Sequence, residues 1–271
     1  MKDDTVSQLL VLPREWLEAA GVIGRFTGNI VRDVWSLRVF RFFGETLRQA
    51  GILIIFSTLV IWSLVFITGL NTCGIEGAYF TEATGTPSYA GVFAAWCNLR
   101  EAVPYAFGYM MAAKVGTGIV AELGAMRISD EIDALEVMGI DSMVFLCATR
   151  LLAAWIALPF MYLAAIGVAY LGSYVAIVDQ IGYVSSGGYL LIFWQFQNVP
   201  DLIFSLIKGM TMATAIVLVA CYYGYTASGG PVGVGRATAK SMVLNLVLIH
   251  IIGMLGTEIF WGGNARAPIG G

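Results

Sequence analysis

Three ionisable residues in the middle of this 271-residue sequence lie inside or beside long apolar segments. Lys114 and Glu122 belong to one segment, and Lys208 belongs to another. Charged side chains surrounded by hydrocarbon are costly, so they are candidates for a functional role such as binding a coupling ion. The alternative is structural. We expect Glu122 to pair with Arg127, and Lys208 to pair with Asp201 or to extend toward the membrane surface.

Arg100 and Glu101 form a charged pair of neighbours just before an apolar segment. A cation there could hold a phosphate or carboxylate headgroup at the mouth of a cavity. The alternative is an interfacial ion pair, with Glu101 near the start of a helix, where a negative charge is favourable. The residues taken alone favour the ion pair.

Residues 122–139 carry the densest run of charges in the middle of the chain. Ser129 can cap a helix whose first turn is acidic, which favours the positive end of the helix dipole. Ile132, Leu135 and Met138 recur every three residues and predict an apolar stripe, and Gly139 can end the helix. This segment is either a solvated turn or a docking helix for a soluble partner. The residues assigned to docking are Arg127, Ser129, Asp130, Glu131, Asp133, Leu135, Glu136 and Met138.

Two features look like enzyme motifs but lack what the chemistry needs. Gly230–Gly235 resembles a P-loop without its lysine and adjacent hydroxyl residue, so we expect no ATP binding by this chain. Ser228 and His250 could suggest an intramembrane serine protease, but about ten residues of helix, or ~15 Å, separate His250 from the end that carries Ser228. No catalytic residue and no cofactor is therefore assigned to the chain itself.

The four cysteines have no metal-ligand spacing, so no metal site is predicted. Cys147 and Cys221 fall in apolar segments and are expected to be packing residues. Cys73 and Cys97 fall in one segment that we place outside the cell. A disulfide between them is possible if that compartment is oxidising, although sequence cannot supply the geometry.

The composition indicates an all-α integral membrane protein. Hydrophobic residues make up 58% of the chain and charged residues 12%, and a soluble domain carries about twice that charge fraction. Segments of about 20 apolar residues cross the ~30 Å hydrocarbon core of a bilayer. Five transmembrane helices are predicted, at residues 51–70, 103–125, 143–172, 202–225 and 241–260. We expect loops at 71–98 and 179–200 and a glycine-rich turn at 228–240.

Residues 13–49 are predicted to form an amphipathic helix in the membrane interface. Phe40, Phe43 and Leu47 fall on one face and three arginines on the other. The chain then divides into an N-terminal segment (1–50), a transmembrane domain (51–262) and a tail (263–271). No cleaved signal peptide and no basic patch of the nucleic-acid-binding kind is visible.

The distribution of Lys and Arg predicts the orientation. With the N-terminus in the cytoplasm, the outer segments hold only Arg100 and Arg266. The inner segments hold Lys2, Arg14, Arg25, Arg32, Arg38, Arg41, Arg48, Arg127, Arg150, Arg236 and Lys240. The positive-inside rule therefore predicts a multi-pass inner-membrane protein with the docking helix in the cytoplasm, between the second and third spans.

Several of these segments resemble the MlaE/YrbE family, the permease subunits of Mce-type ABC lipid transporters. The matching motifs are Ala121–Arg127, Glu131–Leu135, Met138–Asp141, Leu99–Glu101 with Pro104, and Tyr223–Tyr225 through Gly235–Thr238. The resemblance runs from about residue 38 to residue 262. It departs at Ala112–Lys114, where the family usually has Ala-Gly-Arg, and at Ala102–Val103, where it has Leu-Gly.

The resemblance implies a permease without enzyme activity of its own. Two such subunits, identical or related, would form a dimer around a lipid cavity where Arg100 and Glu101 lie. A cytoplasmic ABC ATPase, which holds ATP and Mg²⁺, would contact residues 129–139, and Mce proteins would receive or deliver lipid outside. Two alternatives stay open: an ion-coupled secondary transporter that uses Lys114, Glu122 or Lys208, and an intramembrane serine protease.

Overall fold

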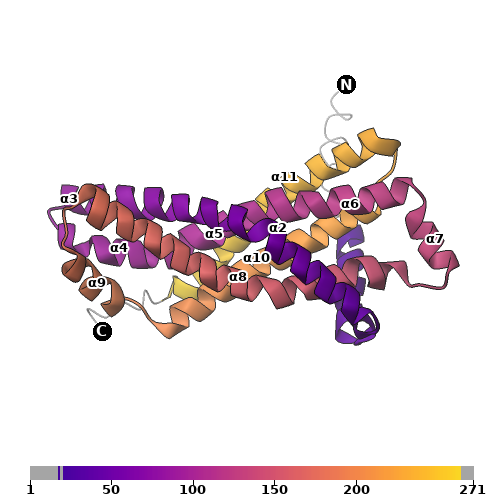
Figure 1. Cartoon of the computed structure of the whole chain (residues 1–271), viewed down its shortest axis with the longest axis horizontal. Coiled ribbons are helices and arrows are strands. Elements are labelled where there is room, and N and C mark those ends of the chain that lie inside the picture. Colours follow the sequence, from indigo (N-terminus) through magenta and orange to yellow (C-terminus); the bar gives the residue numbers. More distant parts are fainter. Residues whose placement is uncertain (1–17, 19–20, 264–271) are drawn as a thin grey trace, which may run out of the picture.

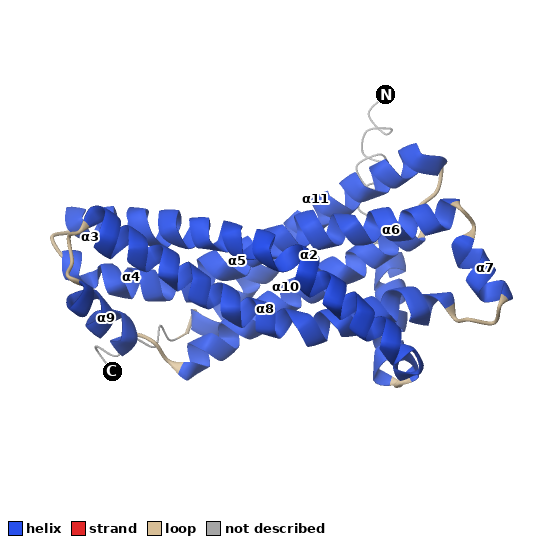
Figure 2. Ribbon diagram, viewed as in Figure 1, coloured by secondary structure: helices blue, strands red, loops and turns tan. Residues whose placement is uncertain are grey.

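The computed structural model describes residue 18 and residues 21–263. Every regular element in this part of the chain is a helix, and Figure 2 shows the helices joined by short loops. The long helices run side by side in an elongated bundle (Figure 1). The predicted all-α class is therefore confirmed.

The first long helix extends well beyond the predicted span at both ends. It begins with a 3₁₀ turn, η1 (Arg38–Phe42), and continues through α2 (Phe43–Thr68), the π-helical segment η2 (Gly69–Glu76) and α3 (Gly77–Ala83). Residues 21–35 form a separate helix, which ends before Leu37, whose φ is 61°. The described part of the predicted interfacial helix is therefore two separate helices. The first is residues 21–35, and the second is η1 with the first residues of α2.

The predicted loop at 71–98 is wrong, because most of it is helical. A tight turn at Thr84–Thr86 reverses the chain, and the short 3₁₀ helix η3 (Pro87–Tyr89) leads into α4 (Ala90–Trp96). Gly74 and Gly77 suggested a loop, but they serve close packing. A Cβ at Gly74 would lie 2.6 Å from the Cβ of Ala176.

The second long helix returns along the first. It continues from α4 through η4 (Cys97–Ala102), α5 (Val103–Met110), η5 (Met111–Gly116) and α6 (Thr117–Ile128). The segments η4 and η5 are π-helical, and such bulges frequently mark functional sites.

The docking segment forms the short helix α7 (Glu131–Val137) at one end of the bundle, whereas α3, α4 and α9 lie at the opposite end (Figure 1). After α7 come η6 (Val144–Ala148), α8 (Thr149–Tyr174), η7 (Val175–Ile181), α9 (Ser186–Gln195), α10 (Val199–Tyr225) and α11 (Gly230–Trp261). Two further loop predictions fail here. The 179–200 segment contains α9, and the expected glycine-rich turn at 228–240 is mostly the first part of α11.

Four of the described helices are long and apolar enough to cross a membrane: 38–83, 144–181, 199–225 and 230–261. The predicted second span, 103–125, is not among them, since Lys114, tyrosines and glycines lower its hydropathy. It lies in the core instead, where Phe107, Met111 and Leu123 are fully buried. Its neighbours therefore shield much of this helix from lipid.

Small residues set the closest helix contacts. A Cβ added to Gly69 would lie 2.4 Å from the carbonyl oxygen of Ala169, and one added to Gly172 would lie 2.5 Å from that of Phe66. Close backbone approach of this kind is how helices pack in membranes, where the hydrophobic effect between helices is weak. The α2–α8 crossing thereby holds the bundle in register.

Candidate functional site

Arg100 is held by a fully buried carboxylate. Its Nη2 and Nε lie 2.7 and 3.2 Å from Oδ2 of Asp201, in the first turn of α10. The other Asp201 oxygen accepts a hydrogen bond of 2.8 Å from Nε1 of Trp261. The guanidinium also lies 4.3 Å from the ring centroid of Trp96, a cation–π distance. The arginine is therefore fixed in one position.

Lys208 is also buried, and its ammonium group has three acceptors. It donates to the backbone oxygen of Arg100 at 2.8 Å, to Oε2 of Glu101 at 2.9 Å and to Oγ1 of Thr257 at 2.7 Å. The predicted pairing with Asp201, and the alternative of extension to the surface, are both wrong. Asp201 lies seven residues back on the same helix and is already occupied by Arg100.

Arg100 and Glu101 lie in one wall of an apolar cavity of about 630 Å³, which we call the outer cavity. Arg100, Glu101, Thr257 and Trp261 contribute to this wall. The other lining residues are mostly aromatic or apolar and come from α3, η3 and α4: Phe80, Thr81, Tyr89, Val92, Phe93 and Trp96. Apolar walls with a fixed cation at one side suit the binding of an amphiphile.

A smaller cavity of about 380 Å³, the side cavity, shares Cys97 and Glu101 with the outer cavity. It lies between Leu64, Thr68 and Thr72 on one side and the start of α5 on the other. The structure joins Cys73 to Cys97 in a disulfide, which ties η2 to η4 beside both cavities. The π-helical segment η4, which carries Arg100 and Glu101, is thus covalently anchored to the first long helix.

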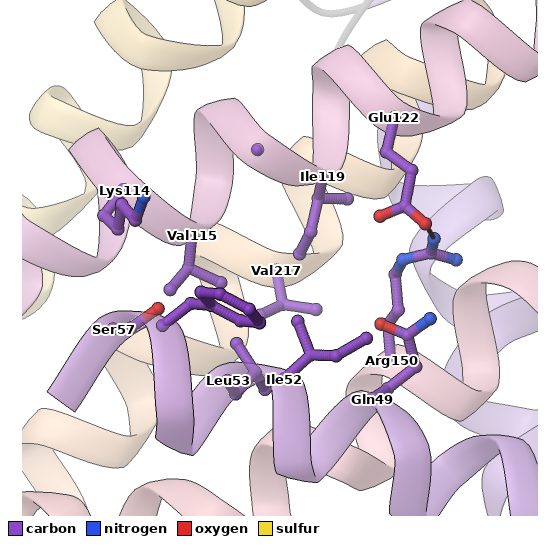
Figure 3. Close-up of a pocket in the computed structure, with 12 residues that line it drawn as sticks. Gln49, Ile52, Leu53, Ser57, Lys114, Val115, Ile119, Glu122, Arg150 and Val217 are labelled. Carbon is purple, nitrogen blue, oxygen red and sulfur yellow. Dashed lines mark ion pairs between the residues drawn. The ribbon is translucent and has the colours of Figure 1, made fainter.

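Lys114 and Glu122 line a third cavity of about 200 Å³, the inner cavity (Figure 3). They do not pair with each other. Glu122 binds Arg150 of α8 at 2.7 Å, and the predicted partner, Arg127, instead binds Asp133 at 2.7 Å. The predicted Glu122–Arg127 pair is therefore wrong, because the Glu122 carboxylate pairs with Arg150 from a neighbouring helix.

The ends of α7 follow the sequence only in part. Gly139 adopts a φ of 75°, and the amides of Gly139 and Ile140 donate to the carbonyls of Glu136 and Leu135 at 2.9 and 3.0 Å. This Schellman motif confirms the predicted helix end. Ser129 is not the N-cap. Its hydroxyl donates back to the preceding helix, and the N-cap residue of α7 is Asp130, whose φ is 59°.

The apolar stripe of α7 is shorter than predicted. Ile132 is fully buried and Leu135 is half-buried, but Met138 is 65% exposed and Val137 is 89% exposed. Glu136 also holds α7 to the bundle, because it accepts hydrogen bonds from Ser142 at 2.7 Å and from Tyr225 of α10 at 3.3 Å. The exposed face of α7 thus presents acidic side chains beside two apolar ones, on a helix fixed to the bundle.

The geometry opposes the protease interpretation. Nε2 of His250 lies 3.1 Å from the hydroxyl of Tyr109, and Nδ1 lies 2.8 Å from the carbonyl of Leu246. Ser228 instead lines a polar cavity with Arg236 and Lys240. Both ring nitrogens of His250 are engaged by groups other than Ser228, so the two residues do not form a dyad.

Comparison with known proteins decides the family. The sequence profile described as permease MlaE matches residues 46–259, which is most of the chain. The chain belongs to the MlaE permease family. Together with its four long apolar helices, this makes it a multi-pass membrane permease.

Several relatives of this MlaE-family permease are similar over most of their length. A probable ABC transporter permease protein of Rickettsia conorii is 30% identical over 89% of this chain and 97% of its own. One from Rickettsia bellii is 28% identical over 90% and 98%. The intermembrane phospholipid transport system permease protein MlaE of Haemophilus influenzae is 24% identical over 83% and 86%.

Sequence reasoning missed several members of the site. Asp201 was considered only as a partner for Lys208, and Trp96, Thr257 and Trp261 were not assigned to the cavity at all. Asp201, Thr257 and Trp261 come from elements far from Arg100 in the sequence, whereas Trp96 lies only four residues before it. The one usable signal was Asp201 beside Pro200. An acidic residue in the first turn of a long apolar helix usually has a structural or functional role.

Proposed function

We propose that this chain is the permease subunit of an ABC-type lipid transport system. The observation that carries the proposal is the outer cavity, where apolar and aromatic walls meet the fixed cation Arg100. Acyl chains would contact the aromatic walls, and the headgroup would lie against Arg100 and Glu101. Binding and release of an amphiphile are the chemistry that such a cavity supports.

We infer that the α7 end faces the cytoplasm and the α3, α4 and α9 end faces outward. Arg127, Arg236 and Lys240 lie near the α7 end, which agrees with the positive-inside rule. The disulfide lies at the other end, and such bonds persist in oxidising compartments. This orientation, with five spans and a cytoplasmic N-terminus in the plasma membrane, is part of the proposal.

ATP hydrolysis by a partner would be coupled to this chain through α7. We propose that a cytoplasmic ATPase, which binds ATP and Mg²⁺, docks on its exposed face. Val137 and Met138 would insert into the partner, and Glu131 and Asp133 would meet basic groups. Because Ile132 and Glu136 fix α7 to the bundle, a displacement of α7 would reach α6 and α10. A ligand changes such an equilibrium only if it binds the two states differently.

Partners outside the cytoplasm follow from the resemblance to the Mce-type transporters. We propose that a second permease, identical or related, pairs with this one and that Mce proteins contact the outer end. The long helix α11 supports the pairing, since it exposes Val243, Val247, Ile251, Met254, Leu255 and Ile259. Acyl chains of the bilayer would cover whatever part of this face the second permease leaves open.

Purification of the tagged chain from its native membrane in mild detergent tests the proposal. We expect a co-purifying ATPase, Mce proteins and extractable lipid. Glu131→Lys should weaken recovery of the ATPase, whereas the matched reversal Glu76→Lys, on an exposed site at the opposite end, should not. Recovery of the chain without any ATPase would overturn the proposal in favour of a secondary transporter.

A further inference from the structure

Lys114 is a charged residue that the proposed function does not use. It lies near the centre of the predicted second span, in the π-helical segment η5, and its side chain is exposed. Among the described residues, no hydrogen-bond or ion-pair partner of Lys114 is found. An uncompensated ammonium group inside a bilayer is costly, and such groups are conventionally paired or face a polar path. Something anionic should therefore meet it.

The inner cavity next to Lys114 has the character of a lipid site. Its floor is apolar, with Leu53 and Phe56 of α2 facing Ile119 of α6. Lys114 lies at one end and the Glu122–Arg150 pair at the other, as Figure 3 shows.

The charges around this cavity are not balanced. Lys114 and Arg150 are cations and Glu122 is an anion, so the three groups carry a net charge of +1. Only 4% of Arg150 is exposed, and within the described part of the chain its Nε has no hydrogen-bond partner. One negatively charged group would neutralise the site.

The inner cavity also lies on the same seam as the side cavity. Both are bounded on one side by α2 and on the other by the second long helix, with residues 64–72 facing 97–109 in the side cavity and residues 49–57 facing 114–122 in the inner one. Tyr109 lines the side cavity, and its hydroxyl lies 3.1 Å from Nε2 of His250, so both add polar groups there. Polar positions therefore follow one another from Glu122 at the inner boundary to Glu101 at the outer cavity.

We propose that Lys114 and the inner cavity form a second lipid site, which holds a single lipid by its anionic headgroup partway along the seam between α2 and the second long helix. The headgroup contacts Lys114, and an acyl chain lies over Leu53, Phe56 and Ile119. The role of this site in transport rests on the proposed function, whereas the existence of the site is tested by lipid binding.

The test is photolabelling of the purified full-length complex in nanodiscs. The probe is phosphatidic acid with a diazirine in one acyl chain, and phosphatidylcholine with the same diazirine is the zwitterionic control. We expect phosphatidic acid to label peptides containing residues 49–57 and 115–122. Lys114→Gln should reduce this labelling about tenfold, the factor that loss of one charge-assisted hydrogen bond corresponds to. Lys114→Arg should retain it, and so should Lys240→Gln, which removes an exposed lysine elsewhere.

Labelling of residues 80–101 in the same samples separates this inference from the proposed function. Label at the outer cavity alone would overturn the second site and leave lipid transport standing, whereas no label at either place would count against both. Equal labelling by the two lipids, or labelling indifferent to Lys114→Gln, would also overturn the second site. A change in oligomeric state with Lys114→Gln, without specific label, would assign Lys114 to a second copy of the chain and overturn it too.

Discussion

The buried ion pair between Arg100 and Asp201 yields the sharpest prediction. Only 12% of the Arg100 side chain and 1% of the Asp201 side chain are exposed, so water screens the pair little. Asp201→Asn keeps an oxygen and the size of the side chain but removes the negative charge of the buried carboxylate beside the guanidinium. Removing one partner of a buried pair costs about 3–5 kcal/mol. Because an asparagine oxygen can still accept the Trp261 hydrogen bond, we expect a loss near the lower end, about 3 kcal/mol.

The assay is equilibrium unfolding in mixed micelles with increasing SDS, followed by tryptophan fluorescence and far-UV circular dichroism. The control is Glu258→Gln, which neutralises an exposed carboxylate on α11 and should change the unfolding free energy by less than about 0.5 kcal/mol. The double variant Arg100→Met with Asp201→Leu should recover most of the stability, since two apolar side chains need no counter-charge. If the unfolding free energy of Asp201→Asn lay within about 1 kcal/mol of that of the natural protein, the inference that water screens this pair little would be refuted.

Three further outcomes are expected. Gly69→Ala should lower the unfolding free energy by about 1–3 kcal/mol, because its Cβ would meet the α8 backbone at 2.4 Å, and Gly51→Ala, with no atom within 4 Å, should not. Ile132→Ala should speed amide hydrogen exchange across α7, since the buried anchor contributes about 2–5 kcal/mol; unchanged exchange would contradict that anchoring. Removing both Cys73 and Cys97 should cost about 3 kcal/mol for their loop, seen as a lower SDS midpoint, and an unchanged midpoint would count against the bond.

Local patterns predicted the helical class and the C-terminal end of α7. The end of α7 at Gly139 followed from one glycine, because a left-handed residue there lets two amides satisfy free carbonyls. Local patterns failed where a residue type serves two purposes. Gly74 and Gly77 suggested a loop, yet they allow close approach of helices, and only the position of the neighbouring helix distinguishes the two uses.

Partners of charged groups were predicted badly for a related reason. Both wrong pairs, Glu122 with Arg127 and Lys208 with Asp201, joined residues of one segment. The observed acceptors of Lys208 include Glu101, 107 residues away. A sequence shows which residues share a helix, but the ion pairs of Glu122, Arg100 and Lys208 form between helices.

The sequence by itself determined that the chain is an all-α membrane protein of the MlaE type, with a short acidic helix between two spans. Hydropathy and helix-end signals are properties of neighbouring residues, so they can be read without knowing how the helices pack. Only the tertiary structure decided that Asp201 holds Arg100 and Trp261 beside one cavity, while Lys114 lines another and has no partner among the described residues. Those outcomes depend on which helix faces are brought within a few ångströms of one another, and packing of the whole bundle sets that.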